Sequence, residues 1–201
     1  MIKSKKVKLM GFLKEKHGMA AFSEIKGAGF HKATLKALRR SGKVERTGRA
    51  LYKLAEGEDL SNPDIVTVSI KAPRSVVCLI SALSFHNATD EIPRQVYIAI
   101  PSGSRPIKID YPPVRFYHFS KSAYEAGIEE HKIDGRTVRI YNLAKTIADS
   151  FKFRNKIGID VARNALKEAL ESRRVRPQEV MHYAEICRVH NVIRPVLEAL
   201  I

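Results

Sequence analysis

The chain contains no tryptophan, and aromatic residues make up only 7% of its 201 residues. A core must therefore be built mainly from the aliphatic residues that dominate its 44% hydrophobic content. Long hydrophobic runs are also missing, because the longest, residues 76–83, has eight residues and includes a serine. A membrane-spanning helix needs about 20 apolar residues. We expect no membrane span and no membrane partner, and no long apolar stretch follows the basic N-terminus as a secretory signal would require.

Cysteine is nearly absent, with only Cys78 and Cys187, each within an apolar pattern. Two such residues predict reduced core side chains of a cytoplasmic protein rather than a disulfide framework. The seven histidines are scattered without metal-ligand spacing. No glycine-rich phosphate loop or nucleophile motif is found. We therefore expect no catalytic residue, no metal and no cofactor.

Acidic residues are scarce in the first quarter of the chain. Residues 1–54 contain 15 Lys or Arg and 3 Asp or Glu, a net charge of +12 out of +15 for the whole chain. The remaining residues are nearly balanced. This asymmetry predicts an N-terminal module that binds a polyanion, attached to a nearly neutral body. The acidic stretch 55–63 is predicted to be a linker, which gives domains at 1–56 and 62–201.

The N-terminal pattern predicts three helices followed by a hairpin. The first helix covers 5–16, and Ser23 is the expected N-cap of a short second helix at 24–26. The third runs from His31 to Ser41 and ends at Gly42. Strands at 44–46 and 50–54 flank a Thr-Gly-Arg turn. This order is that of a winged helix-turn-helix.

The rest of the chain predicts an α+β domain with a small, mostly antiparallel sheet and a helical C-terminal half. A helix follows Asn62-Pro63, and a buried helix is expected at 75–87. Strands are expected at 95–100 and 114–119, with a short helix at 120–126. A hairpin of 129–133 and 137–141 turns at Asp134-Gly135. Four further helices are expected, with their starts marked by Asn142, Asp160, Pro177 and Asn191.

The predicted third helix has two faces. Leu35 and Leu38 lie with His31 on the side expected to pack, and the other side combines small and long basic residues. That combination suits insertion into a major groove, because alanine permits close approach while Lys and Arg reach bases or phosphates. The residues predicted to bind DNA from this helix are Lys32, Ala33, Lys36, Ala37 and Arg40. A solvated basic face is the alternative interpretation.

Basic residues also decorate the predicted hairpin. Arg46, Arg49 and Lys53 are predicted to contact phosphates or the minor groove. The alternative is that these charges protect an edge strand from aggregation. A second basic segment, residues 151–156, alternates with aromatics and is interpreted either as a phosphate or partner contact or as an ordinary helix end whose cations complement the dipole.

Two other classes of function stay open. Asp110 with Glu130-His131-Lys132 matches a short Asp…Glu-x-Lys pattern, in which the carboxylates would hold Mg²⁺ and Lys132 would assist the attacking water. This pattern predicts a magnesium-dependent nuclease, although it is short and degenerate. An RNA-binding or protein-interaction module is the third hypothesis.

Several segments resemble one known family. Residues 34–38, 41–46 and 48–52 resemble the N-terminal winged helix of AbiEi-type antitoxins, the predicted regulators of type IV toxin–antitoxin operons. Residues 78–86, 144–152 and 154–158 resemble the C-terminal part of the same family, in the family's order. The family often has glycine where this chain has Ala50.

The resemblance implies a bacterial transcriptional regulator with an antitoxin role. Its winged helix would bind double-stranded operator DNA and repress its own operon. Its second domain would oppose a nucleotidyltransferase-like toxin, with or without a stable complex. We expect a monomer or weak dimer that pairs on DNA.

Overall fold

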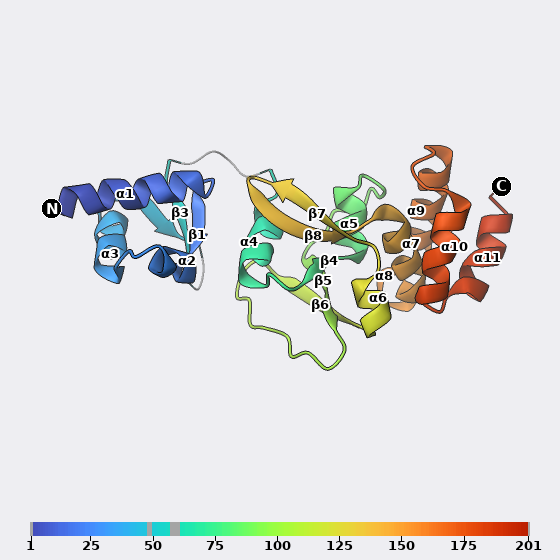
Figure 1. Cartoon of the computed structure of the whole chain (residues 1–201). Helices are drawn as coiled ribbons and strands as arrows, with labels where there is room; N and C mark the ends of the chain where they lie inside the picture. Colours follow the sequence, from blue (N-terminus) through green and yellow to red (C-terminus); the bar gives the residue numbers. More distant parts are fainter. Residues whose placement is uncertain (1, 48–49, 57–60, 201) are drawn as a thin grey trace. The chain divides into compact units, whose positions relative to one another are not determined.

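The computed structural model describes residues 2–47, 50–56 and 61–200. The chain forms two compact units (Figure 1). Unit 1 consists of Met1–Pro73, Lys108–Pro112 and Lys132–Thr137, and unit 2 consists of the remaining segments. The predicted domains 1–56 and 62–201 stay a prediction about independent folding, because residues 57–60 of the linker lie outside the described part of the chain.

Unit 1 contains a small antiparallel sheet and four helices within the described residues. The strands pair in the order β1-β3-β2. The elements are α1 (Ile2–Glu15), β1 (Met19–Ala21), α2 (Phe22–Gly27), α3 (Lys32–Arg40), β2 (Val44–Arg46), β3 (Leu51–Leu54) and α4 (Pro63–Lys71). Strand β1 was not predicted, because three residues are too few to show an alternating pattern.

Aliphatic residues from all three N-terminal helices form the core of unit 1. Leu9 and Leu13 of α1 are fully buried with Ile25 of α2 and with Leu35 and Leu38 of α3. The leucine pairs are spaced three or four residues apart, which puts each pair on one face of its helix. The sequence periodicity therefore predicted the buried leucines of α1 and α3, but His31, which was expected on the packed side of α3, is exposed.

Unit 2 holds a five-stranded sheet in the order β6-β5-β4-β8-β7 and a helical C-terminal half. The tip of the β7–β8 hairpin, residues 132–137, is part of unit 1. The elements are β4 (Val76–Val77), α5 (Leu79–Phe85), β5 (Val96–Pro101), β6 (Val114–Phe119), α6 (Lys121–Glu125), β7 (Ile128–Ile133), β8 (Arg136–Tyr141), α7 (Leu143–Lys152), α8 (Arg154–Ile157), α9 (Ile159–Glu171), α10 (Pro177–Ile186) and α11 (His190–Glu198).

The sheet of unit 2 is mixed, and the prediction of a mostly antiparallel sheet was wrong. Strand β4 pairs with β5 antiparallel but with β8 parallel, and β5 pairs with β6 parallel. The predicted helix at 75–87 is in fact strand β4 followed by α5. Val76 and Val77 pair with Ala99 and Ile98 of β5, so the first residues of the run form a strand instead of a helix. A short apolar run carries no periodicity that separates a strand from a buried helix.

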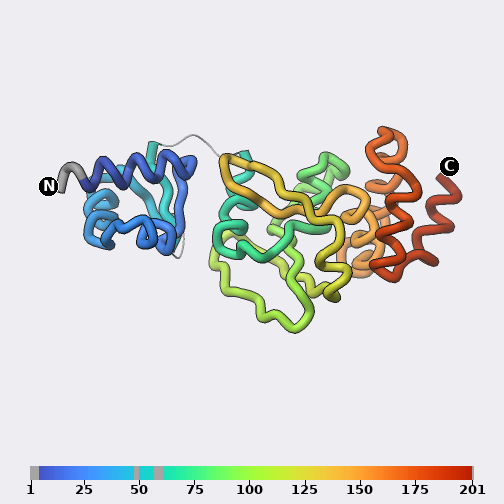
Figure 2. Tube along the Cα trace, viewed as in Figure 1, coloured from blue at the N-terminus to red at the C-terminus, as the bar shows by residue number. Residues whose placement is uncertain are grey.

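Helix α7 is the centre of the helical half. Every residue from Leu143 to Phe151 is buried. Helices α5, α9 and α10 pack against it, and the last three helices follow one another at the C-terminal end of the unit (Figure 2). A helix that is enclosed on all sides carries apolar residues around its whole circumference, and any polar residue on it must find a partner inside the core.

The predicted helix starts had mixed outcomes. Asn142 caps α7 as expected, since its side chain accepts a hydrogen bond from the Lys145 backbone N–H at 2.8 Å. Ser23 and Asp160 are not N-caps, and Asn191 does not precede the last helix, because α11 begins at His190 and Asn191 lies in its first turn. Helix α2 follows β1 directly, so Ala21 takes the cap position and Ser23 falls in the first turn. Gly158 precedes α9, and Asp160 lies in the first turn, where a negative charge favours the helix dipole.

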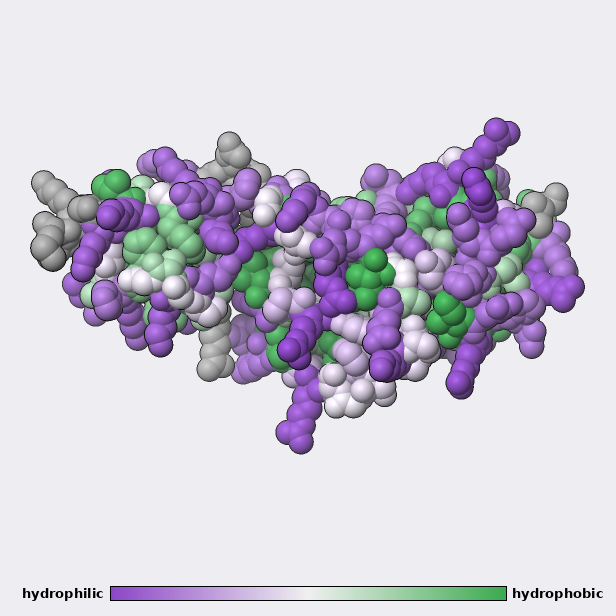
Figure 3. Space-filling model, in the orientation of Figure 1, coloured by the Kyte–Doolittle hydropathy of each residue, from purple (hydrophilic) through white to green (hydrophobic). Residues whose placement is uncertain are grey.

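No helix among the described residues is long and apolar enough to cross a membrane. The face of the molecule drawn in Figure 3 is mostly hydrophilic, and hydrophobic residues show there as small separate patches.

Candidate nucleic-acid interface

Helix α3 presents a basic face that the structure leaves accessible. Leu35 and Leu38 are each 1% exposed and turn into the core of unit 1. At about 100° per residue, the predicted DNA-binding residues fall on the opposite side of the helix. Four of them are exposed and Ala37 is half-buried: Lys32, Ala33, Lys36, Ala37 and Arg40. The helix contains no acidic residue, so its outer face carries positive charge only.

Local hydrogen bonds fix both ends of α3. Before the helix, the Phe30 backbone N–H donates to the Ile25 carbonyl at 3.1 Å, and the Phe30 ring lies 5.6 Å from that of Phe12. After the helix, Gly42 adopts φ 69°, and the Lys43 N–H donates to the Leu38 carbonyl at 3.1 Å. This is the glycine-terminated helix end that the sequence predicted. The turns therefore hold the basic face rigidly on the core.

The hairpin residues do not form one group. Arg46 is exposed and pairs in register with Tyr52, while Lys53 is half-buried in the central strand opposite Glu45. Neighbouring residues of a strand point to opposite faces, so Arg46 and Lys53 lie on opposite faces of the sheet. Arg49 lies outside the described residues. The structure therefore places on opposite faces of the sheet two hairpin residues that were both predicted to contact DNA.

The position before β3 has a conformation that glycine adopts easily. Ala50 has φ 59°, in the left-handed region. The Ala50 carbonyl accepts a hydrogen bond from the Phe22 N–H at 2.7 Å, which ties the hairpin to the start of α2. An L-residue with a Cβ pays a steric cost there that glycine avoids.

Two residues of the nuclease pattern pair with near neighbours in the sequence. Asp110 lies in the connection between β5 and β6 and pairs with Lys108 at 3.8 Å. Lys132 donates to the Thr137 hydroxyl at 2.5 Å across the β7–β8 hairpin, and Glu130 is exposed on β7. Within the described ranges, no group of three or more His, Cys, Asp or Glu residues is arranged to hold a metal ion.

Unit 2 contains a buried ion pair that sequence analysis missed. The Lys145 ammonium lies 2.5 Å from the Asp149 carboxylate, and both side chains are 0% exposed. The ammonium also lies 4.1 Å from the centre of the Tyr141 ring and 4.9 Å from that of Phe119. The Cys187 thiol donates to the second Asp149 oxygen at 3.2 Å. The available signal was a Lys and an Asp four residues apart in an otherwise apolar helix.

Burial sets the protonation of this cluster. It raises the pKa of Asp149, while the Lys145 ammonium acts in the opposite direction. Burial also raises the pKa of Cys187 to about 12, and that of Cys78 well above its ordinary value. Both cysteines are free, buried thiols, which confirms the predicted reduced core residues. Because they stay protonated, neither is an effective nucleophile or metal ligand.

The basic segment 151–156 contacts its own unit. The Arg154 guanidinium donates to the Phe151 carbonyl at 2.9 Å, close to the helix end. The Lys156 ammonium lies 5.7 Å from the centre of the Tyr117 ring and 5.8 Å from that of Phe153. These contacts favour the interpretation in which the cations stabilise the end of a helix and cover aromatic surface.

Comparison with known proteins gives a likeness of fold. No family model and no curated protein matches the chain. Among solved structures, the chain is similar to the RV2827C protein from Mycobacterium tuberculosis, with a TM-score of 0.54 and 11% sequence identity. The similarity covers 94% of this chain and 79% of that one. At this identity the likeness shows the fold alone, and it extends over nearly the whole chain.

Proposed function

We propose that the chain is a transcriptional regulator that binds double-stranded DNA through a winged helix in unit 1. The observation that carries the proposal is the rigidly held α3, whose exposed face combines Lys32, Lys36 and Arg40 with alanines. Major-groove binding needs a helix that protrudes from a packed core and brings basic side chains to the bases. The +12 charge of residues 1–54 supplies the attraction to phosphates.

The order of elements supports the winged-helix interpretation. Helices α2 and α3 are joined by a short turn, and the β2–β3 hairpin follows directly. In a helix-turn-helix protein the second of two such helices enters the groove, which assigns that role to α3. Arg46 and Arg49 would then reach phosphates beside the groove, and Lys53 would stabilise the sheet opposite Glu45.

We further propose that the protein is an antitoxin that represses its own operon. This part rests on the resemblance to AbiEi-type antitoxins in both halves of the chain. Unit 2 would oppose a nucleotidyltransferase-like toxin. The nearly balanced charge of residues 55–201 fits a role distinct from DNA binding.

The test compares duplex DNA from the protein's own promoter with a random duplex, using fluorescence anisotropy on the full-length chain. Lys36→Ala and Arg40→Ala should each weaken promoter binding about 5- to 100-fold and random binding much less, since a good base contact contributes ~1–3 kcal/mol. Lys121→Ala, at the exposed start of α6 in unit 2, removes one charge as the matched control and should leave both affinities unchanged.

Salt dependence provides a second measurement. If roughly 5–8 phosphates are neutralised, affinity should fall steeply between low and physiological salt. An affinity that does not change over this range of salt would contradict binding through α3. So would a loss of affinity in Lys121→Ala as large as that in Lys36→Ala or Arg40→Ala. If Lys36→Ala loses the same affinity for the promoter duplex and the random duplex, Lys36 contacts only the DNA backbone.

Repression and antitoxicity should separate in the full-length chain. The variant carrying Lys36→Ala with Arg40→Ala should lose repression of a promoter reporter yet still rescue cells that express the cognate toxin from an unrelated promoter. Loss of rescue by this variant, with rescue by the native chain retained, would show that antitoxicity depends on the DNA-binding residues and would contradict the separation of the two activities.

The two alternative functions have direct assays. A magnesium-dependent nuclease would cleave DNA or RNA in a manner that Asp110→Asn and Glu130→Gln abolish. An RNA-binding module would bind RNA in preference to the promoter duplex in a competition experiment.

A further inference from the structure

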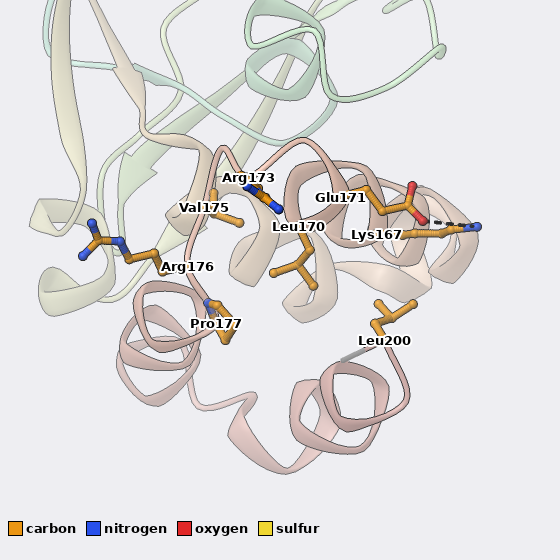
Figure 4. Close-up of a pocket in the computed structure, with 8 residues that line it drawn as sticks. All are labelled: Lys167, Leu170, Glu171, Arg173, Val175, Arg176, Pro177 and Leu200. Atoms are coloured by element: carbon orange, nitrogen blue, oxygen red, sulfur yellow. Dashed lines mark ion pairs between the residues drawn. The ribbon is translucent and has the colours of Figure 1, made fainter.

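A groove runs between α9 and α11 in the helical half of unit 2. Its first part has a volume of about 750 Å³ and a hydrophobic floor formed by Ile159, Val192 and Val196. The adjoining part, of about 410 Å³, is lined by Leu170, Pro177 and Leu200 (Figure 4). Lys167 and Leu200 line both parts. We call this continuous depression the α9–α11 groove.

The floor of the groove is incompletely covered hydrophobic surface. Leu170 and Val196 pack on the core cluster of the helical half with one side only and are half-buried. Leu200 is 38% exposed, and Figure 4 shows it facing the same hollow as Leu170 and Pro177. Apolar side chains that meet in a concave site from three helices are typical of surfaces that a partner covers.

The rim of the groove is basic. Arg154, Arg163 and Lys167 line its larger part, which contains no acidic residue. In the smaller part, Lys167 pairs with Glu171 at 3.8 Å, and both side chains are more than half exposed. Such an exposed pair is weak, so an incoming carboxylate can replace Glu171. Arg163 has no ion-pair partner among the described residues.

The combination of floor and rim selects the chemistry of the ligand. A nucleic acid would match the cations, but its phosphates would leave the hydrophobic floor exposed to water. A purely apolar helix would cover the floor but would leave the arginines without carboxylates. An amphipathic helix with leucines on one face and glutamates beside them matches both features. Helix α9 is 13 residues long, or about 20 Å, so the groove accommodates about three to four turns of such a helix.

We propose that the α9–α11 groove binds an acidic amphipathic helix of a partner protein. This surface belongs to unit 2, and the proposal does not rest on DNA binding by α3. It gives the helical half a function of its own, that of a docking site for a protein.

The probe is a fluorescein-labelled, side-chain-stapled peptide of 14 residues, with leucines at positions i, i+3, i+7 and i+10 and mainly glutamates elsewhere. Its counterpart has the same leucines with lysines in place of the glutamates. Anisotropy titrations use the full-length chain. We expect saturable binding of the acidic peptide and at least tenfold weaker binding of the lysine peptide, because only the acidic peptide complements the basic rim.

Substitutions in the chain show where the peptide binds. Arg163→Glu with Lys167→Glu should weaken the acidic peptide at least tenfold, and Leu200→Asp should weaken it as well. The matched control, Arg94→Glu with Lys121→Glu, makes the same charge change at exposed positions of unit 2 outside the groove. It should leave the affinity within about twofold. A benzophenone in the peptide should crosslink to tryptic fragments of α9 or α11.

Several outcomes would overturn the proposal. No saturable binding to the native chain would do so, as would binding that the two rim substitutions leave unchanged. Weakening by Lys36→Ala with Arg40→Ala instead would place the peptide on the basic unit 1. A dimer in sedimentation experiments that Leu200→Asp dissociates would show that a second copy of the chain occupies the groove. Duplex DNA binding by the rim variant should remain native, so this test fails or succeeds independently of the DNA-binding proposal.

Discussion

The buried Lys145–Asp149 pair offers the sharpest test of the forces within unit 2. Both side chains are 0% exposed and their charged atoms lie 2.5 Å apart. Asp149→Asn would leave the ammonium buried without its counter-charge, and Lys145→Met would do the same to the carboxylate. Breaking a buried pair by removing one partner costs about 3–5 kcal/mol. This is a large part of the ~5–15 kcal/mol that stabilises a typical domain.

The two single variants should differ in their response to pH. In Lys145→Met the stranded carboxylate can take up a proton. From an ordinary pKa of about 3.9, neutralisation costs ~4 kcal/mol at pH 7 but only ~1.5 kcal/mol at pH 5. Its destabilisation should therefore shrink by up to ~2–3 kcal/mol over this range. In Asp149→Asn the stranded group is an ammonium, whose neutralisation becomes costlier as pH falls, so its destabilisation should not shrink.

Urea unfolding followed by tyrosine fluorescence measures these differences, because five of the seven tyrosines lie in unit 2 and tryptophan is absent. Each variant is compared with the native chain at pH 7 and at pH 5. Lys145→Met combined with Asp149→Leu is the matched control, and it should unfold within about 2 kcal/mol of the native chain, since both charges leave together. Single variants that each cost less than about 1 kcal/mol, or that respond identically to pH, would refute the reasoning.

Three further predictions follow from backbone conformation and burial. Ala50→Gly should raise the free energy of unfolding of unit 1 by ~0.5–1 kcal/mol, because φ is 59° at that position. A lower free energy of unfolding would contradict this. Gly127→Ala should cost about 2 kcal/mol or more in urea unfolding, since its Cβ would lie 2.7 Å from that of Lys145. Gly103→Ala, with a similar φ and no neighbour within 4 Å, is its control and should cost about half as much or less. Burial lowers the pKa of His86, so its contribution to stability should be complete above about pH 6.5 and decline as pH falls below that value. His86→Gln should flatten this part of the pH profile between pH 7.5 and 5.5, and an unchanged profile would exclude His86 as its source.

Local signals predicted a large part of the fold and of the candidate interface. The leucine spacing and Gly42 placed α3 and its basic face correctly, because helix periodicity and a glycine-terminated helix end depend on neighbouring residues only. Asn142 and Pro177 marked the starts of α7 and α10 for the same reason. Ser23 failed as a cap because the chain before α2 is held by the pairing of β1 with β3, so that Ala21 takes the cap position. Asp160 failed because α9 begins directly after Gly158, whose backbone N–H is bonded to the Arg154 carbonyl of the preceding helix.

By itself the sequence determined that the chain has a basic N-terminal part, where helices such as α1, α3 and α7 lie and which face of α3 is basic. Both charge and helix periodicity depend only on residues that are close together in the sequence. Only the tertiary structure decided the parallel pairing of β4 with β8, the separation of Arg46 from Lys53, the burial of Lys145 with Asp149 and the groove beside α9. Each of these depends on a partner far along the chain or on the packing of several elements. A strand or a charge has the same local pattern whichever partner it meets, so the choice is made by the packing that buries the most surface and leaves the fewest polar groups unpaired.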